Sequence, residues 1–155
     1  MELKVGDRAP DFIAATYGGS KIKIRDYLGS QNLVLYFYPK DDTPGCTKEA
    51  CSFRDNLEKL NSSNTAVLGI SVDNVKSHEK FRDKYKLNFD LISDKNKEIV
   101  GKYGVEREGK SNQVRANRVT FLIDKKGIIR YIWKKVNVEG HVEEVLEKIK
   151  ELKLE

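Results

Sequence analysis

Short runs of β-branched and aromatic residues alternate with helical segments along this 155-residue chain. Runs of this composition, bounded by turn residues, are typical of strands. Strands that alternate with helices and close on a hairpin indicate an α/β layer fold. The predicted strands span about Leu33 to Tyr38, Ala66 to Val72, Val119 to Asp124 and Ile128 to Lys134.

Helical segments occupy the stretches between these strands. One begins at Cys46 and is predicted to run on to about Leu60, because an apolar stripe at helical spacing is formed by Cys46, Ala50, Phe53, Leu57 and Leu60. A second is predicted from about Val75 to Tyr85, and a shorter one from about Lys95 to Tyr103. The last helix is predicted to begin at Val138, with Asn137 as its cap.

The chain is predicted to form one domain, residues 1–155. Its 39% hydrophobic content supports a sizeable core, and no linker rich in Pro, Gly or Ser divides it. The segment through Ile24 is expected to add a small N-terminal β-hairpin. Charged residues near the start and the lack of a long apolar run argue against a signal peptide and a membrane span, so we expect a soluble, cytoplasmic protein.

The net charge of +5 raises the question of a nucleic-acid partner. Basic and acidic residues are interspersed, however, and the basic stretch from Lys125 to Lys135 alternates with apolar residues as a half-exposed strand would. We therefore expect neither a nucleic acid nor a membrane as partner.

The chain has two cysteines, Cys46 and Cys51, and two histidines, His78 and His141. No second cysteine pair exists to complete a usual zinc ligand set, so we expect no metal. Both histidines are predicted to be structural or exposed. A cysteine pair this close in sequence is a poor disulfide framework, and in a reducing compartment it is more often catalytic or redox-active.

Cys46 is the candidate nucleophile. It follows a strand and a turn rich in Asp, Pro and Gly, and it opens a helix, whose dipole favours the thiolate. A free cysteine on an apolar stripe is ordinarily a small buried hydrophobe. Here, however, Pro44 and Gly45 remove bulk from the approach to the thiol, and Thr43 adds a hydroxyl beside it. These neighbours favour a reactive thiol over a packing residue.

Cys51 follows Cys46 by five residues and could condense with it after oxidation. In a continuous helix the two Cα atoms would lie roughly 8 to 9 Å apart. A disulfide usually requires a Cα–Cα separation of about 4.4 to 6.8 Å. If the two residues pair, at least one helical turn must unwind first.

Three segments resemble one known family. Residues 35–51, LYFYPKDDTPGCTKEAC, are similar to the active-site signature of peroxiredoxins of the bacterioferritin comigratory protein (PrxQ) group. Residues 6–12, GDRAPDF, and 117–124, NRVTFLID, resemble other segments of the family in order and spacing. The resemblance covers nearly the whole chain.

This resemblance implies a thiol peroxidase that reduces hydrogen peroxide and organic hydroperoxides without a metal or organic cofactor. Carried onto this sequence, it makes Cys46 the peroxidatic cysteine and Cys51 the resolving one, joined after oxidation in an intramolecular disulfide. Thr43, Pro44 and Arg118 would complete the pocket. Arg118 stands at the start of a predicted buried strand, where a cation needs an anionic partner.

The resemblance also implies a thioredoxin-like fold with a central mixed sheet flanked by helices. Thioredoxin or a similar dithiol would recycle the enzyme, in keeping with a disulfide that a partner thiol can reach. A monomer is expected, with a dimer as the alternative. The implied role is antioxidant defence and redox homeostasis.

Two other functions compete with a peroxidase. A dithiol-disulfide reductase of the thioredoxin type would carry Cys-X-X-Cys and a proline before a late strand, but the only prolines here are Pro10, Pro39 and Pro44. A redox sensor or holdase chaperone would use the same cysteines without turnover. Kinetics separate these, because an enzyme consumes many equivalents of peroxide and a sensor stops after one.

Overall fold

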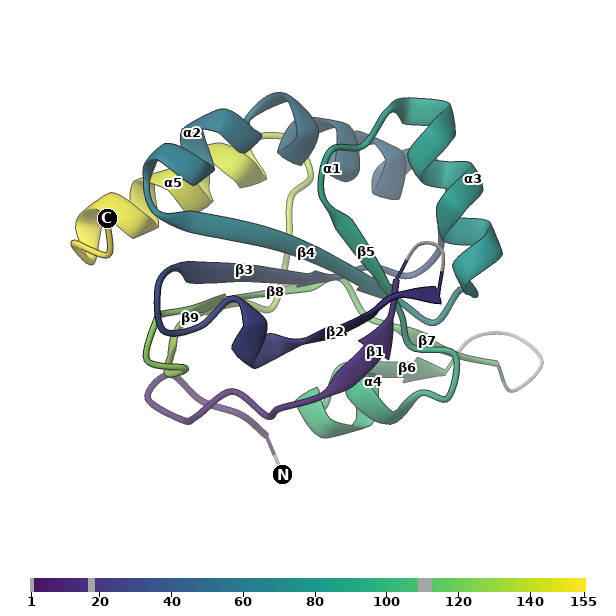
Figure 1. Ribbon diagram of the computed structural model, residues 1–155, viewed down its shortest axis with the longest axis horizontal. Helices are drawn as coiled ribbons and strands as arrows, with labels where there is room; N and C mark the ends of the chain where they lie inside the picture. The colour runs from purple at the N-terminus through teal and green to yellow at the C-terminus, as the bar shows by residue number, and fades with distance from the viewer. Residues whose placement is uncertain (1, 17–18, 109–112) are drawn as a thin grey trace.

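One mixed β-sheet organises the computed structural model, which describes residues 2–16, 19–108 and 113–155 (Figure 1). Within these residues seven strands form the sheet in the order β2-β1-β5-β4-β3-β8-β9. Strands β3, β4 and β5 run parallel, and β1 and β8 flank them in the antiparallel sense. The strands are β1 (Ile13–Ala15), β2 (Lys21–Lys23), β3 (Asn32–Phe37), β4 (Thr65–Ser71), β5 (Asp90–Ser93), β8 (Val119–Ile123) and β9 (Ile129–Trp133).

Helices cover both faces of this sheet. Figure 1 shows α1, α2, α3 and α5 on one side, and α4 with the small hairpin of β6 and β7 on the other. The bounds are α1 (Pro44–Asp55), α2 (Leu57–Ser62), α3 (Val75–Tyr85), α4 (Glu98–Tyr103), α5 (His141–Glu151), β6 (Glu106–Glu108), β7 (Val114–Ala116) and the 3-10 turn η2 (Ile24–Asp26).

The central strand β3 is buried along its whole length, and successive residues serve two separate cores. Leu33, Leu35 and Phe37 pack on the face that carries α4. Val34 and Tyr36 pack on the other face, with α1, α3 and α5. Because strand side chains alternate between faces, one short apolar run supplies both cores.

The register of the sheet brings two distant segments to one edge. In the antiparallel pair of β3 and β8, Phe37 lies opposite Val119. The chain leaves β3 at Tyr38 toward α1, and it enters β8 from Arg118. These two residues therefore emerge side by side, at the carboxyl ends of the parallel strands, where α/β folds commonly place their sites.

The predicted strands appear within a residue or so of the expected positions, and the expected N-terminal hairpin is formed by β1 and β2. Helix α3 has the predicted bounds. Strand β5 was not expected from the sequence. The α/β layer architecture is confirmed.

Predictions about the bounds of three helices were wrong. The last helix begins at His141 behind a left-handed Gly140, because the Asn137 side chain accepts from the backbone of Glu139 and caps a turn instead. The cysteine helix ends at Asp55, and α2 starts separately after Asn56.

The short helix α4 starts at Glu98 and not at Lys95. Lys97 is left-handed, at φ 62°. The Asp94 carboxylate accepts from the backbone N–H groups of Ile99 and Val100, which fixes the first turn. None of the described helices is long and apolar enough to cross a membrane.

Gly69, buried in β4, provides a test of core packing. A Cβ there would lie 2.8 Å from Leu91 and 2.9 Å from the Tyr36 ring. We expect Gly69→Ala to lower the free energy of unfolding by about 1 to 3 kcal/mol through overpacking. The measurement is urea unfolding. The control is Gly101→Ala in α4, where the nearest atom lies 3.8 Å away and alanine favours the helix. Equal loss in both variants would contradict the packing account.

Candidate active site

Cys46 lies in the first turn of α1 and is 1% exposed. The turn is set up by Asp42, which is left-handed at φ 56°, and by Thr43, which is extended and precedes Pro44 at the first helical position. The Thr43 carbonyl accepts from Thr47 N–H at 2.8 Å and closes the turn. The predicted placement of the thiol at a helix start is therefore confirmed.

Arg118 contacts the thiol directly. Its Nη2 donates to Cys46 Sγ at 3.2 Å, and its Nη1 donates to Glu49 Oε1 at 2.7 Å. A Cβ on Gly45 would lie 3.1 Å from the same Nη2, so the lack of a side chain there lets the guanidinium approach. A cation at this distance favours an anionic sulfur.

Glu49 was not singled out from the sequence. It is 1% exposed, and burial raises its pKa to about 7 against the opposing effect of Arg118. Burial disfavours the charge on Arg118, but Glu49 and Cys46 outweigh it and hold the pKa of Arg118 above its usual value. The available signal was spacing, since a residue three positions after Cys46 lies one helical turn along.

Thr43 and Pro44 begin the helix that carries the thiol, Thr43 as its N-cap residue and Pro44 as its first residue. The Thr43 hydroxyl donates to the Lys40 carbonyl at 2.9 Å, and its oxygen can still accept from a bound molecule. Pro44 is exposed. Both residues therefore belong to the turn that leads into the buried thiol.

Cys51 is half-buried further along the same helix, and neither of the two described cysteines is in a disulfide. Helix α1 runs unbroken through both residues, which is the continuous arrangement that keeps the two thiols too far apart to form a disulfide. Cys51 opens onto a surface hollow of about 460 Å³ lined also by Asp42, Pro44, Thr47, Lys48, Lys84 and Tyr85. The two thiols thus have different surroundings, one dry and one at the surface.

Both histidines are buried, and neither contacts Cys46 through a hydrogen bond. His141 Nε2 lies 2.9 Å from the Thr120 hydroxyl, and burial together with the nearby Arg118 charge lowers the pKa of His141 to about 4. Its ring is therefore neutral near pH 7. His78 pairs with Asp41 at 2.7 Å. The prediction of structural histidines is consistent with these contacts.

Asp41, Asp73 and His78 bring ligand-type atoms within 4.8 Å of one another. These atoms are engaged by hydrogen bonds: Asp41 accepts from Tyr38, Ser77 and His78, and Asp73 accepts from the Asp41 backbone. These residues fit a hydrogen-bond network better than a metal site, because a cation would have to displace the groups that donate to the two carboxylates.

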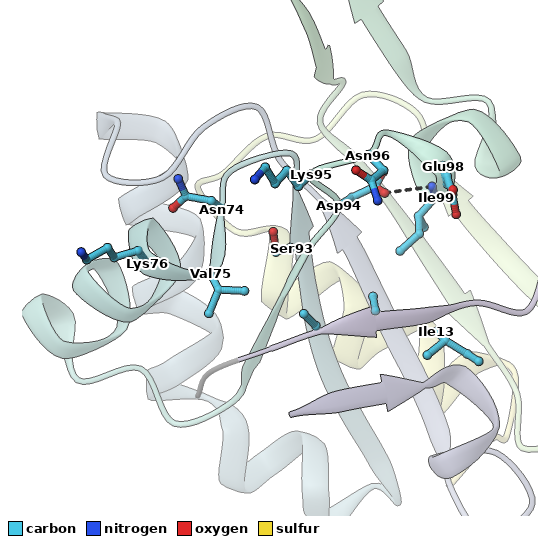
Figure 2. A pocket seen from close by; sticks show the side chains of 12 residues that line it. Ile13, Asn74, Val75, Lys76, Ser93, Asp94, Lys95, Asn96, Glu98 and Ile99 are labelled. Carbon is cyan, nitrogen blue, oxygen red and sulfur yellow. Dashed lines mark hydrogen bonds between the residues drawn. The ribbon is translucent and has the colours of Figure 1, made fainter. Parts of the chain in front are cut away.

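A second hollow, of about 420 Å³, lies between β1 and the starts of α3 and α4 (Figure 2). Asp94 lines this hollow, and its carboxylate accepts a hydrogen bond from the Ile99 N–H. Cys46, Cys51 and Arg118 do not line it. This hollow is therefore separate from the thiol site.

Comparison with known proteins agrees with this geometry. The model of the AhpC/TSA family matches residues 5–132. A putative peroxiredoxin bcp from Coxiella burnetii is 48% identical, over 94% of this chain and 98% of its own length. The crystal structure of a cysteine-to-serine mutant of Xylella fastidiosa PrxQ has 35% identity and a TM-score of 0.91, and 99% of each chain is covered.

A further solved structure is that of Xanthomonas campestris bacterioferritin comigratory protein, obtained for insight into its alkyl peroxide reduction activity. It is 33% identical to this chain, with a TM-score of 0.84 over 91% of each chain. These structural neighbours confirm the predicted thioredoxin-like fold.

Arg118→Met should slow the first reaction of Cys46 with peroxide by about 10²- to 10³-fold, because a fixed donor at the reacting sulfur is lost while side-chain volume is roughly kept. Stopped-flow measurement of Cys46 oxidation gives the rate. The control is Arg130→Met, which removes a similar charge that pairs with Asp124 at 3.3 Å instead. Equal rates in the wild type and Arg118→Met would exclude a role for Arg118 at the sulfur.

Glu49→Gln should change how stability depends on pH. Because the pKa of Glu49 rises from 4.5 to about 7 on folding, the folded state holds a proton that the unfolded chain has lost between these values. The Glu49 contribution therefore falls by roughly 1 to 3 kcal/mol as pH rises through that window. His141, with a lowered pKa, contributes with the opposite sign.

The difference in unfolding free energy between wild type and Glu49→Gln isolates the Glu49 contribution, because His141 is common to both. It should decline from pH 4.5 to 7 and then level off. Urea unfolding across this range gives the curve. A flat difference would mean that Glu49 is ionised in the folded state throughout.

Proposed function

This chain belongs to the AhpC/TSA family as a peroxiredoxin of the Bcp/Q group, and we propose a complete peroxidase cycle for its two cysteines. Its activity is that of a thiol-dependent peroxidase, an antioxidant oxidoreductase that takes a peroxide and a thiol reductant. The observation that carries the assignment of Cys46 as peroxidatic is the contact of its buried sulfur with Arg118 at 3.2 Å.

In the first step the Cys46 thiolate attacks one oxygen of the O–O bond. An S–O bond forms, the O–O bond breaks, and the other oxygen leaves as an alkoxide or hydroxide that takes up a proton. Arg118 stabilises the negative charge that moves from sulfur to the leaving oxygen. The Thr43 hydroxyl and the N–H groups of Gly45 and Cys46 would hold the peroxide in line.

In the second step the Cys51 sulfur attacks the Cys46 sulfenic acid, and water leaves as the disulfide forms. Helix α1 keeps Cys46 buried and Cys51 at the surface hollow. The first turns of α1 must therefore unwind before the sulfurs can meet. Pro44 would shield the sulfur from bulk water until then.

A dithiol reductant completes the cycle by exchange with the Cys46–Cys51 disulfide. Cys51 already lies near the surface in the helical form, and unwinding of α1 would expose the disulfide further, as thiol-disulfide exchange requires a sulfur that the reductant can reach. We propose thioredoxin or a similar dithiol protein in this role. The proposed setting is a monomer with a single domain, working in the cytoplasm, where thiols are kept reduced.

Alkyl hydroperoxides are proposed as substrates along with hydrogen peroxide. The supporting observation is the structural neighbour from Xanthomonas campestris, a protein studied for alkyl peroxide reduction. The attack on the O–O bond is the same for both substrates, because the alkyl group resides on the leaving oxygen.

Cysteine variants test both proposed roles. Cys46→Ser should abolish peroxide turnover, because a hydroxyl provides almost no anion near neutral pH. Cys51→Ser should react with one equivalent of peroxide, fail to turn over with thioredoxin, and accumulate sulfinic acid. The measurements are NADPH-coupled peroxide consumption and intact mass. Turnover by Cys46→Ser would remove Cys46 from its role, and a wild type that stops after one equivalent would favour a sensor.

A further inference from the structure

Asp41 is the most heavily bonded residue of the turn between β3 and Cys46. Its carboxylate accepts from the Tyr38 hydroxyl at 2.6 Å, from the Ser77 hydroxyl at 2.7 Å and from His78 Nδ1 at 2.7 Å. Its backbone N–H donates to Asp73 Oδ2 at 2.8 Å. Four contacts therefore hold this one residue, which lies five positions before the reactive cysteine.

The bond between Asp41 and His78 is buried and charge-assisted. His78 is 0% exposed and Asp41 is 7% exposed. His78 Nε2 faces the Ile92 carbonyl at 3.0 Å, and a carbonyl can only accept, so Nε2 carries a proton. The other nitrogen, Nδ1, shares a proton with the Asp41 carboxylate. Such bonds are stronger than those between neutral groups.

Tyr38 adds a permanent donor to the same carboxylate. Burial, followed by the charge of Asp41, raises the pKa of the Tyr38 phenol well above its ordinary value. The hydroxyl therefore keeps its proton at physiological pH. Tyr38 extends from the end of β3, whereas Ser77 and His78 belong to α3, so the carboxylate ties the sheet edge to that helix.

Asp42, the next residue, is tied to the same helix in a different way. Its carboxylate accepts from Lys84 Nζ and from the Tyr85 hydroxyl, both at 2.8 Å. These contacts are at the surface, where water screens them. Along the turn, then, a buried attachment at Asp41 is followed at once by an exposed one at Asp42.

We propose that Asp41, held by His78 and Ser77, is the fixed end of the segment that unwinds, and that this anchor sets how long oxidised Cys46 stays in the helical site. Asp41 is thus a positioning residue for the resolution step. This inference rests on the cycle proposed above, in which Cys46 and Cys51 form a disulfide after local unwinding.

The lifetime of the helical form decides between two fates of the Cys46 sulfenic acid. If α1 opens, the Cys51 sulfur displaces water from the sulfenic acid and the disulfide forms. If α1 stays closed, a second hydroperoxide oxidises the sulfenic acid to sulfinic acid and is itself reduced to the alcohol or water. A fixed end limits the conformations that the unwound segment can adopt, so a firmer anchor disfavours the open form and favours the second fate. A weaker anchor lets the unwound segment gain conformational freedom by releasing that end, so it favours the first fate.

Asp41→Asn should raise the ratio of disulfide to sulfinic product about tenfold at a fixed peroxide concentration, because it removes the charge from the bond to His78 while keeping the side-chain size. Asp42→Asn is the matched control, with the same substitution one residue on, and should change the ratio less than about twofold. Quenched-flow sampling with intact mass measures both products.

A general loss of stability must be separated from a weaker anchor. Ile24→Val, in the core on the opposite face, lowers global stability without touching the turn and should leave the product ratio unchanged. If Asp41→Asn does not fold, Ser77→Ala removes one of the same bonds and should shift the ratio in the same direction. A ratio unchanged in both variants, or shifted equally by Asp42→Asn, would overturn the proposal.

Amide hydrogen exchange on the wild-type protein locates the fixed end independently of any variant. In the disulfide form the Asp41 amide, bonded to Asp73, should stay protected, while amides from Gly45 to Ala50 lose protection relative to the reduced form. Equal loss at Asp41 would overturn the anchor. Equal protection of Gly45 to Ala50 in both forms, or no Cys46–Cys51 disulfide at all, would instead refute the proposed cycle.

Discussion

The site depends on one guanidinium that is shared by two buried acceptors. Arg118 reaches Cys46 Sγ and Glu49 Oε1 at once, and both acceptors are almost fully shielded from water. The pairing of Phe37 with Val119 makes this possible, because it sets Arg118 beside the chain that leaves β3. A shift of register by one residue would turn Arg118 to the other face of the sheet, away from α1. The reactivity of the thiol therefore rests on sheet register as much as on helix position.

The same helix must be rigid in one state and open in the next. Cys46, Ala50 and Phe53 are buried along α1, so the reduced form gains from their packing. The break at Asn56 separates α1 from α2, which packs on β4 through Leu60. Unwinding can therefore stop within α1 and leave the following core in place. A single longer helix would couple the opening of the site to the loss of more apolar contacts.

The sequence was sufficient for features that depend on local pattern. Strand β3 and helix α3 have strong periodicity or cap signals, and Cys46 has its turn residues beside it. Strand β5, in contrast, has four residues and is defined by pairing with β4 across the α3 crossover, which no local window contains. The contact of Asp41 with His78 spans 37 positions for the same reason. Arg118 was assigned through family resemblance, because its position at the start of a buried strand does not by itself single it out among 29 basic residues.

Charge around the sulfur is sensitive to pH near neutrality, and the reason lies in two residues that do not react. His141 is neutral, with a pKa of about 4, so it adds no positive charge beside Arg118. Glu49 titrates at about 7, and its Oε2 has no hydrogen-bond partner within the described part of the chain. When Glu49 is protonated, the sulfur of Cys46 is the only anionic partner that Arg118 can have among the described residues of the site. When Glu49 ionises, its carboxylate and an anionic sulfur compete for the guanidinium. The burial of Glu49 therefore links pH to the way in which Arg118 is shared between the carboxyl group and the Cys46 sulfur.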